Sequence, residues 1–124
     1  MKRNKITIKS AKAKGRRLQN WTAEKISQIT GYEFGKDKPI EPRPMGQSGT
    51  DVRLESNVYN LFPFYIECKF QEHWNIPEWI EQAKKNSKNN HWLLICKKSR
   101  SEPVIVLDAN LFFSIYEELI KSKK

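Results

Sequence analysis

An acid and a base, Glu67 and Lys69, stand two positions apart in the most regularly alternating segment of the chain. In the β-strand that this alternation predicts, both side chains point to the same face. Asp51 opens the preceding predicted strand, and pairing the two strands as a hairpin would bring its carboxylate next to Glu67. The main-chain carbonyl of Cys68 would then point sideways as a further oxygen ligand. Such a set suits metal-assisted hydrolysis of a phosphodiester, in which a hard divalent cation neutralises phosphoryl charge and activates water.

The acid-x-lysine spacing is weak evidence by itself. The composition predicts about two chance matches to this tripeptide, and Glu67-Cys68-Lys69 is the one that the chain contains. The alternative is an ion pair across a solvated sheet face, worth less than ~1 kcal/mol. The residues alone leave both interpretations open.

Hydropathy periodicity predicts the elements that would position these residues. Leu18, Thr22, Ile26 and Ile29 share one face of a helix expected over 16–30. The other predicted elements are strands at 51–55, 62–70, 91–97 and 104–107, and helices at 77–86 and after Asp108. The first two strands are expected to be joined by a turn at Ser56 and Asn57, and 35–50 to hold no regular element. The resulting order, α-β-β-α-β-β-α, predicts an α/β fold with a mixed β-sheet flanked by helices.

Positive charge dominates the composition. The net charge is +9, and residues 1–17 hold eight Lys and Arg residues and no acid. We expect a basic N-terminal arm at 1–15, mobile or paired at a sheet edge, before a domain at 16–124. The excess favours a polyanionic partner, nucleic acid before a membrane surface. The candidates for phosphate contacts are Lys12, Lys14, Arg16, Arg17, Arg43, Arg53 and His73.

Other classes of protein are excluded or disfavoured. No stretch approaches the ~20 apolar residues of a membrane span. The two histidines lack the spacing of a zinc module. Cys68 and Cys96 lie in apolar runs and are expected to be buried free thiols, as in the reducing cytoplasm of a bacterial or phage-infected cell.

The sequence resembles the PD-(D/E)xK nuclease superfamily, and within it the small resolvase-like endonucleases of phages and archaea that cut branched DNA such as Holliday junctions. The resemblance covers roughly residues 10–120 and follows five features in order. These are a basic segment leading into a helix with Glu24, Gly49-Thr50-Asp51 opening a strand, Glu67-Cys68-Lys69 on the next strand, a helix with Gln82, and a basic strand ending. The motif's Pro before the Asp is absent. The resemblance implies a restriction-endonuclease-like core.

Carried over by position, the resemblance implies that Asp51 and Glu67 bind Mg²⁺, for which Mn²⁺ would substitute, with Glu24 as an outer or second-metal ligand. Lys69 would orient water or stabilise developing charge, and Gln82 would hold substrate or water. The implied partners are DNA, branched or junction DNA in particular, and a second copy of the chain, since a resolvase cuts two strands symmetrically. The alternatives are a nuclease of the same superfamily acting on linear or single-stranded DNA, and a non-catalytic DNA-binding module of the same fold.

Overall fold

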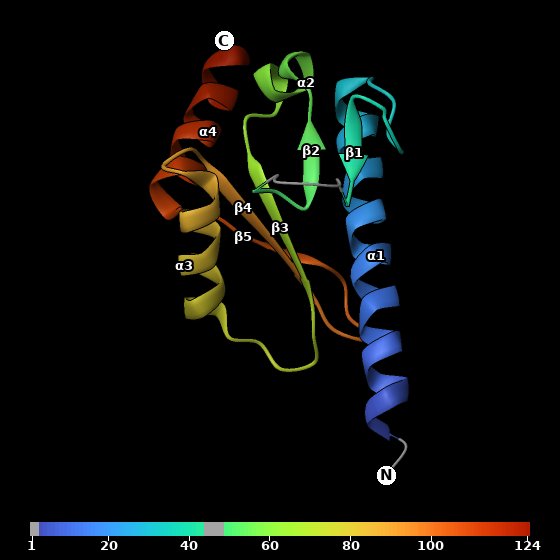
Figure 1. The fold of residues 1–124 in the computed structure, drawn as a ribbon. Coiled ribbons are helices and arrows are strands. Elements are labelled where there is room, and N and C mark those ends of the chain that lie inside the picture. The colour runs from blue at the N-terminus through green and yellow to red at the C-terminus, as the bar shows by residue number, and fades with distance from the viewer. Residues whose placement is uncertain (1–2, 44–48) are drawn as a thin grey trace.

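The structure, a computed structural model, describes residues 3–43 and 49–124 as an α/β fold (Figure 1). Two short sheets lie between helices. In chain order the elements are α1 (Arg3–Thr30), β1 (Ile40–Pro42), β2 (Val52–Leu54), α2 (Ser56–Leu61), β3 (Tyr65–Phe70), α3 (Ile76–Ser87), β4 (Trp92–Lys97), β5 (Val104–Val106) and α4 (Ala109–Ser122).

The larger sheet is mixed and has the strand order β3-β4-β5. β3 and β4 are parallel and joined by a crossover through α3, whereas β5 is antiparallel to β4. The register places Glu67 beside Leu94 and Lys69 beside Cys96. β1 and β2 form a separate antiparallel pair. The expected mixed sheet flanked by helices is therefore confirmed.

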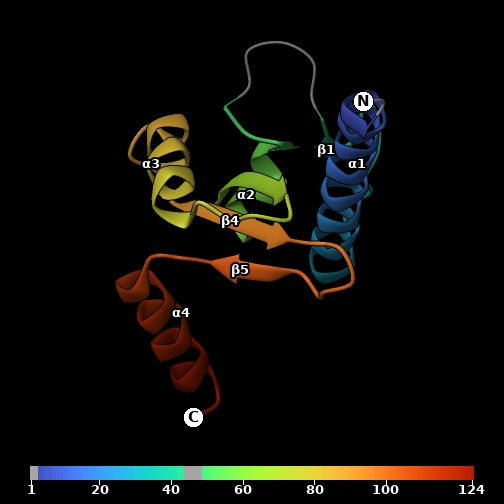
Figure 2. The ribbon, with the colours of Figure 1, turned by 90° about the horizontal axis from the view of Figure 1, so that it is seen from below.

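Apolar side chains cover β4, the central strand of the larger sheet, on both faces. Leu93 and Ile95 of β4 belong to the cluster that α1 helps to form, and Trp92, Leu94 and Cys96 belong to the cluster under α3. This arrangement explains why β4 is an almost continuous apolar run. Figure 2 shows α3 and α4 on opposite sides of β4 and β5.

The N-terminal arm prediction is wrong in its conformation. Residues 3–15 form the first half of α1, which continues without interruption through Gly15. The brief alternation of Ile6 and Ile8 suggested an edge strand, but Lys, Arg and Ala dominate this segment and all favour helix.

Two further elements differ from those expected. β1 lies within the connection 35–50 that was expected to hold no regular element. The turn expected at Ser56 and Asn57 is the start of helix α2, so β2 and β3 are not joined as a hairpin. β1 and β2 each have three residues, too few for periodicity to identify reliably.

A side chain caps the N-terminus of each of the last two helices. The Asn75 side chain accepts a hydrogen bond from the N–H of Glu78 at the start of α3, and Asp108 accepts one from Leu111 at the start of α4. Among the described residues, none of the helices combines the length and apolar character needed to cross a bilayer.

Gly49 lets the segment before β2 pass very close to the end of α3. A Cβ at this position would lie 2.6 Å from the carbonyl oxygen of Asn86, closer than real side chains approach. The backbone that Gly49 approaches is therefore the C-terminal end of a helix.

Replacing Gly49 by Ala should therefore strain this contact. We expect Gly49→Ala to lower the free energy of unfolding by about 1–3 kcal/mol, because the backbone has to shift. Gly15→Ala is the matched control, since a Cβ there meets open space inside a helix. It should raise stability by about 0.5–1 kcal/mol. Denaturant unfolding compares the two, and an unchanged Gly49→Ala would contradict the close approach.

Candidate active site

Asp51 is tied to β3 through backbone hydrogen bonds, although no hairpin connects their strands. The N–H of Asp51 donates to the carbonyl of Ile66 (2.7 Å), and the N–H of Ile66 donates to the hydroxyl of Thr50 (2.9 Å). The N–H of Cys68 then donates to Asp51 Oδ2 (2.8 Å). Asp51 therefore lies next to the strand that carries Glu67, as expected. A short contact between residues 50–51 and the edge of β3 brings them together, in place of the expected hairpin.

Glu67 is almost completely buried, with 6% of its surface exposed. It lies on the face of β3 that α3 covers, where the Asn86 amide donates to Glu67 Oε1 (2.6 Å). Asn86 belongs to the last turn of α3, the same turn that Gly49 approaches. The close approach of Gly49 to the end of α3 thus helps to position Asn86, the hydrogen-bond partner of Glu67.

Burial sets the electrostatics of both acids. Desolvation raises the pKa of Asp51, and the hydrogen bond from Cys68 and the charge of Lys69 only partly offset it. Desolvation also raises the pKa of Glu67, with a further rise from the neighbouring Asp51 charge; the Asn86 hydrogen bond and Lys69 act in the opposite sense. Two acids that share a poorly solvated position favour a cation between them.

Lys69 provides a nearby positive charge on the same face of β3 as Glu67. Its Nζ lies 5.9 Å from the centre of the Trp79 ring, and Trp79 is 6% exposed on α3. The charge lowers the pKa of both carboxyl groups, so Lys69 lies within electrostatic reach of each. A buried ring beneath the ammonium group restricts where the lysine can point.

The donors at this position fit a hard divalent cation. Each of the two hydrogen bonds above engages one carboxylate oxygen, leaving Asp51 Oδ1 and Glu67 Oε2 as candidate ligands. The N–H of Ile66 bonds to Thr50 and its carbonyl bonds to Asp51, so this edge of β3 faces the segment that carries Asp51. Residues two apart in a strand direct their backbone groups to the same edge, so the carbonyl of Cys68 also points there. Mg²⁺ prefers oxygen ligands and commonly uses one or two carboxylates together with water and substrate phosphate.

The thiols do not belong to this donor set. Both cysteines are free, and burial raises the pKa of Cys68 to about 12 and that of Cys96 to about 11. The Cys68 sulfur lies 3.7 Å from the Thr22 hydroxyl of α1, on the other face of β3 from Glu67. The prediction of free thiols is confirmed, with Cys68 only half-buried as a whole residue.

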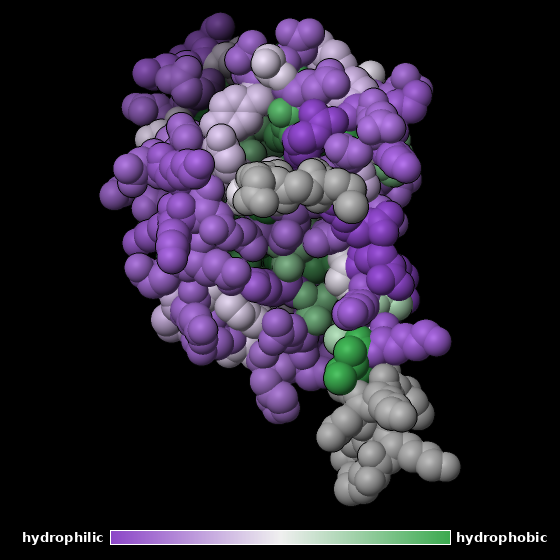
Figure 3. Space-filling view, viewed as in Figure 1, coloured by the Kyte–Doolittle hydropathy of each residue, from purple (hydrophilic) through white to green (hydrophobic). Residues whose placement is uncertain are grey.

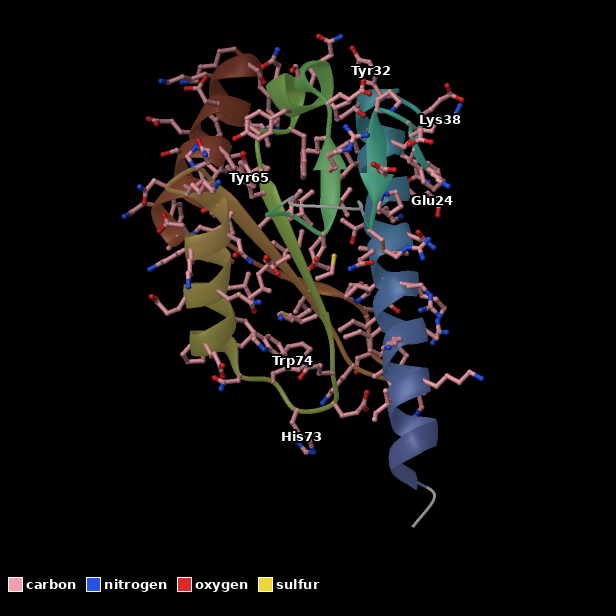
Figure 4. All side chains as sticks on the ribbon, viewed as in Figure 1. Glu24, Tyr32, Lys38, Tyr65, His73 and Trp74 are labelled. Atoms are coloured by element: carbon pink, nitrogen blue, oxygen red, sulfur yellow. The ribbon has the colours of Figure 1, made fainter. Side chains whose placement is uncertain are left out.

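Glu24 does not join Asp51 and Glu67 in this structure. It is exposed on α1, two residues from the buried Thr22 and two from the buried Ile26. Since two residues turn an α-helix by about 200°, Glu24 points away from the packed face. Figure 4 shows it on the outer side of α1. Among the described residues, no group of three or more His, Cys, Asp or Glu side chains is placed to hold a metal ion.

Asn86, rather than Gln82, provides the amide that contacts Glu67. Gln82 is exposed one turn earlier on α3. A signal for Asn86 was present in the sequence, because it lies seven residues after Trp79 and three after Ala83, both buried. A polar residue on the continuation of an apolar stripe marks a side chain directed inward.

Two of the predicted phosphate-binding residues have partners within the protein. Arg53 Nε donates to Glu41 Oε1 at 2.9 Å in an ion pair that is only partly exposed. Lys14 Nζ donates to the hydroxyl of Ser99 at 3.0 Å, which ties α1 to the β4–β5 turn. For these two residues the structure therefore shows a stabilising contact.

The other basic candidates are exposed and lie on different elements. Lys12, Arg16 and Arg17 are on α1. Arg43 directly precedes residues 44–48, which lie outside the described part of the chain. His73 follows β3 and points away from the body in Figure 4. Of these residues, Arg43 lies beside Asp51, because its backbone N–H donates to the Asp51 carbonyl (2.8 Å). The three residues on α1 belong to a helix that packs against the face of β3 opposite Glu67.

An α/β fold that holds a half-buried Asp51 and a buried Glu67 within electrostatic reach of each other and of Lys69 is suited to metal-assisted phosphodiester hydrolysis. The family of phage putative PDDEXK endonucleases matches residues 10–124, and the chain belongs to this family. Family membership assigns it to the PD-(D/E)xK nucleases and implies a DNA substrate. Comparison with curated proteins and with solved structures finds no match.

The raised pKa values lead to a prediction for stability. As pH rises through and above the ordinary values of 3.8 and 4.5, the folded protein binds more protons at Asp51 and Glu67 than the unfolded chain, so stability falls. Asp51→Asn and Glu67→Gln retain an acceptor oxygen but lose the charge. Without metal, each should be more stable than wild type by about 1 kcal/mol near pH ~7, and this advantage should vanish near pH ~4.

Thermal unfolding in EDTA at the two pH values measures this difference, and a stability difference of about 1 kcal/mol corresponds to about 4 °C. Glu24→Gln is the control, because Glu24 is exposed and away from the pair. It should behave as wild type. Destabilisation of both amide variants near pH ~7 would show that the two charges are not in conflict.

Proposed function

We propose that the chain is a Mg²⁺-dependent DNA endonuclease that cuts branched DNA, with Mn²⁺ as a substitute metal. The observation that carries the proposal is a pair of acids beside Lys69, the half-buried Asp51 and the buried Glu67, for both of which desolvation raises the pKa. An unpaired carboxylate at such a position is costly, and two of them oppose each other. A bound divalent cation relieves both costs, which supports a site built to hold one.

The residues of the chain divide the work as follows. Asp51 and Glu67 would hold the metal, and the carbonyl of Cys68 would add an oxygen ligand. The bound metal neutralises phosphoryl charge and lowers the pKa of water. Lys69 directs its ammonium group at the reacting water or the developing negative charge. Asn86 acts through Glu67 and is a positioning residue, because its amide fixes the carboxylate.

A hollow beside these acids offers room for substrate. It has a volume of about 350 Å³ and its lining includes Thr50, Tyr59, Tyr65, Asn86 and Lys88. The Tyr59 and Tyr65 rings meet edge to face with centroids 5.9 Å apart. We propose that it receives the nucleotide next to the scissile phosphate, since an aromatic face stacks on any base and a lysine suits its phosphate.

Charge and surface character support DNA as the partner. The net charge is +9, so affinity for DNA should fall steeply with salt. On the face shown in Figure 3, hydrophilic side chains dominate, and apolar ones are visible mainly in a central strip. The preference for junctions and the action as a homodimer in the cytoplasm rest on the resemblance to resolvase-like members.

Two alternative functions can be distinguished from this proposal by experiment. A nuclease of the same family acting on linear or single-stranded DNA would use the same site. A non-catalytic DNA-binding module would keep the fold and would gain no stability from Mg²⁺ or Mn²⁺, whereas a metal site is stabilised by mass action.

The test compares cleavage of a labelled four-way junction with that of a matched linear duplex, in Mg²⁺ and in EDTA. We expect metal-dependent cutting of the junction, reduced by at least about a hundredfold in Asp51→Asn and in Lys69→Met. Equal cutting of both substrates would contradict the junction preference and indicate a general nuclease. Binding of DNA without cutting in either metal would indicate the non-catalytic DNA-binding module.

The role of Asn86 has its own prediction. Asn86→Ala should weaken Mg²⁺ binding or activity by about 10–100-fold, as is usual for residues that orient a metal ligand. Gln82→Ala, a turn away and exposed, is the matched control and should stay close to wild type. Titration of activity against Mg²⁺ distinguishes the roles. A loss of stability in Asn86→Ala with an unchanged metal requirement would make Asn86 purely structural.

A further inference from the structure

Helix α4 has no buried residue along its length, although its sequence is strongly apolar. Leu111 is half-buried at its start, but Phe113 is 70% exposed and Phe112, Ile115 and Tyr116 are between 45% and 48% exposed. The large apolar side chains of α4 after Leu111 are therefore left exposed within one chain.

This exposure conflicts with the stability of the helix. A 14-residue helix is marginal in water by itself, and helices in proteins derive most of their stability from packing an apolar face. Soluble monomers also rarely expose contiguous apolar patches of more than a few hundred Å². Something outside the described contacts has to cover α4.

The surface continues from α4 onto the body of the protein. β5 is an edge strand of the larger sheet, and its Ile105 is 60% exposed. Between the first turns of α4 and the segment from Leu61 to Phe64 lies an apolar groove of about 880 Å³. We call the whole region the α4–β5 surface. Its largest exposed apolar side chains are those of Leu61, Ile105, Phe112, Phe113, Ile115, Tyr116, Leu119 and Ile120.

We propose that the α4–β5 surface binds the same surface of a second copy of the chain. It offers both a projecting apolar helix and an apolar groove, so a two-fold arrangement fills the groove of each copy with the helix of the other. Pairing would also cover the β5 edges, which are otherwise open to non-specific strand addition.

The area matches what such an interface requires. The eight large side chains are about half exposed, so each contributes about 100 Å² and together they contribute about 800 Å² per copy. Stable protein interfaces bury about this area on each partner. DNA is a poor occupant of this surface, because an apolar helix offers nothing to a phosphate backbone.

The position leaves the candidate active site accessible. α4 and α3 lie on opposite sides of β4 and β5 (Figure 2), and Glu67 and Lys69 lie on the face that α3 covers. A second copy bound at α4 would therefore not block them. The association does not depend on the nuclease proposal; only its consequence, two active sites for paired cuts, rests on that proposal.

Sedimentation of the full chain over a wide concentration range tests the association. Wild type is expected at twice the chain mass of 14.7 kDa. Phe113→Glu should raise the dissociation constant by at least about thirtyfold, as for a central aromatic residue of an interface. Ile29→Glu is the matched control, because Ile29 is also 70% exposed but lies on α1. It should remain a dimer.

A wild-type chain that sediments as a monomer at every concentration would overturn the proposal, and so would a dimer that Phe113→Glu leaves intact. Far-ultraviolet circular dichroism verifies that the variants remain folded. Cleavage of DNA is measured separately. A dimer that cuts no DNA would refute the nuclease proposal but support the interface. A monomer that cuts DNA would refute the interface but support the nuclease proposal.

Discussion

Burial disfavours charge on both Asp51 and Glu67, which lie within electrostatic reach of each other, and this conflict organises the surrounding structure. Three groups offset it: the N–H of Cys68, the amide of Asn86 and the ammonium group of Lys69. The N–H of Cys68 and the side chain of Lys69 belong to β3, whereas the amide of Asn86 belongs to α3. The acids are therefore held by contacts that exist only when the β2 segment, β3 and α3 are assembled together.

The parallel crossover from β3 through α3 to β4 makes this assembly possible. It places α3 over the face of β3 that carries Glu67 and Lys69, with Trp79 beneath the lysine and Asn86 against the glutamate. The absence of a side chain at Gly49 then lets the segment that carries Asp51 approach the end of the same helix. Packing of α3 thus helps to position all three charged residues, and hydrogen bonds to β3 hold Asp51 as well.

The two faces of the larger sheet have different tasks under the proposals made above. The face under α3 carries the charged residues, whereas the opposite face leads to α4 and its uncovered apolar side chains. A charged site that binds a polyanion and an apolar surface that binds protein are best kept apart, because each would weaken the other if they overlapped. The sheet provides this separation.

The sequence by itself determined the features that depend on local periodicity. The alternation of β3 put Glu67 and Lys69 on one face, hydropathy predicted β4 as a strand, and Asp108 marked the start of the last helix. Five features in order, among them Asp51 and Glu67-Cys68-Lys69, indicated the nuclease family that residues 10–124 match.

Only the tertiary structure decided which distant residues meet. Asn86 contacts Glu67 across 19 positions, and Asp51 reaches Cys68 across 17 without a hairpin between them. Glu24, which shares its helix with the core residues, faces away. Periodicity shows which side of an element a residue occupies, but the contacts of that side depend on how the elements pack. That packing is a property of the whole chain, which no local pattern contains.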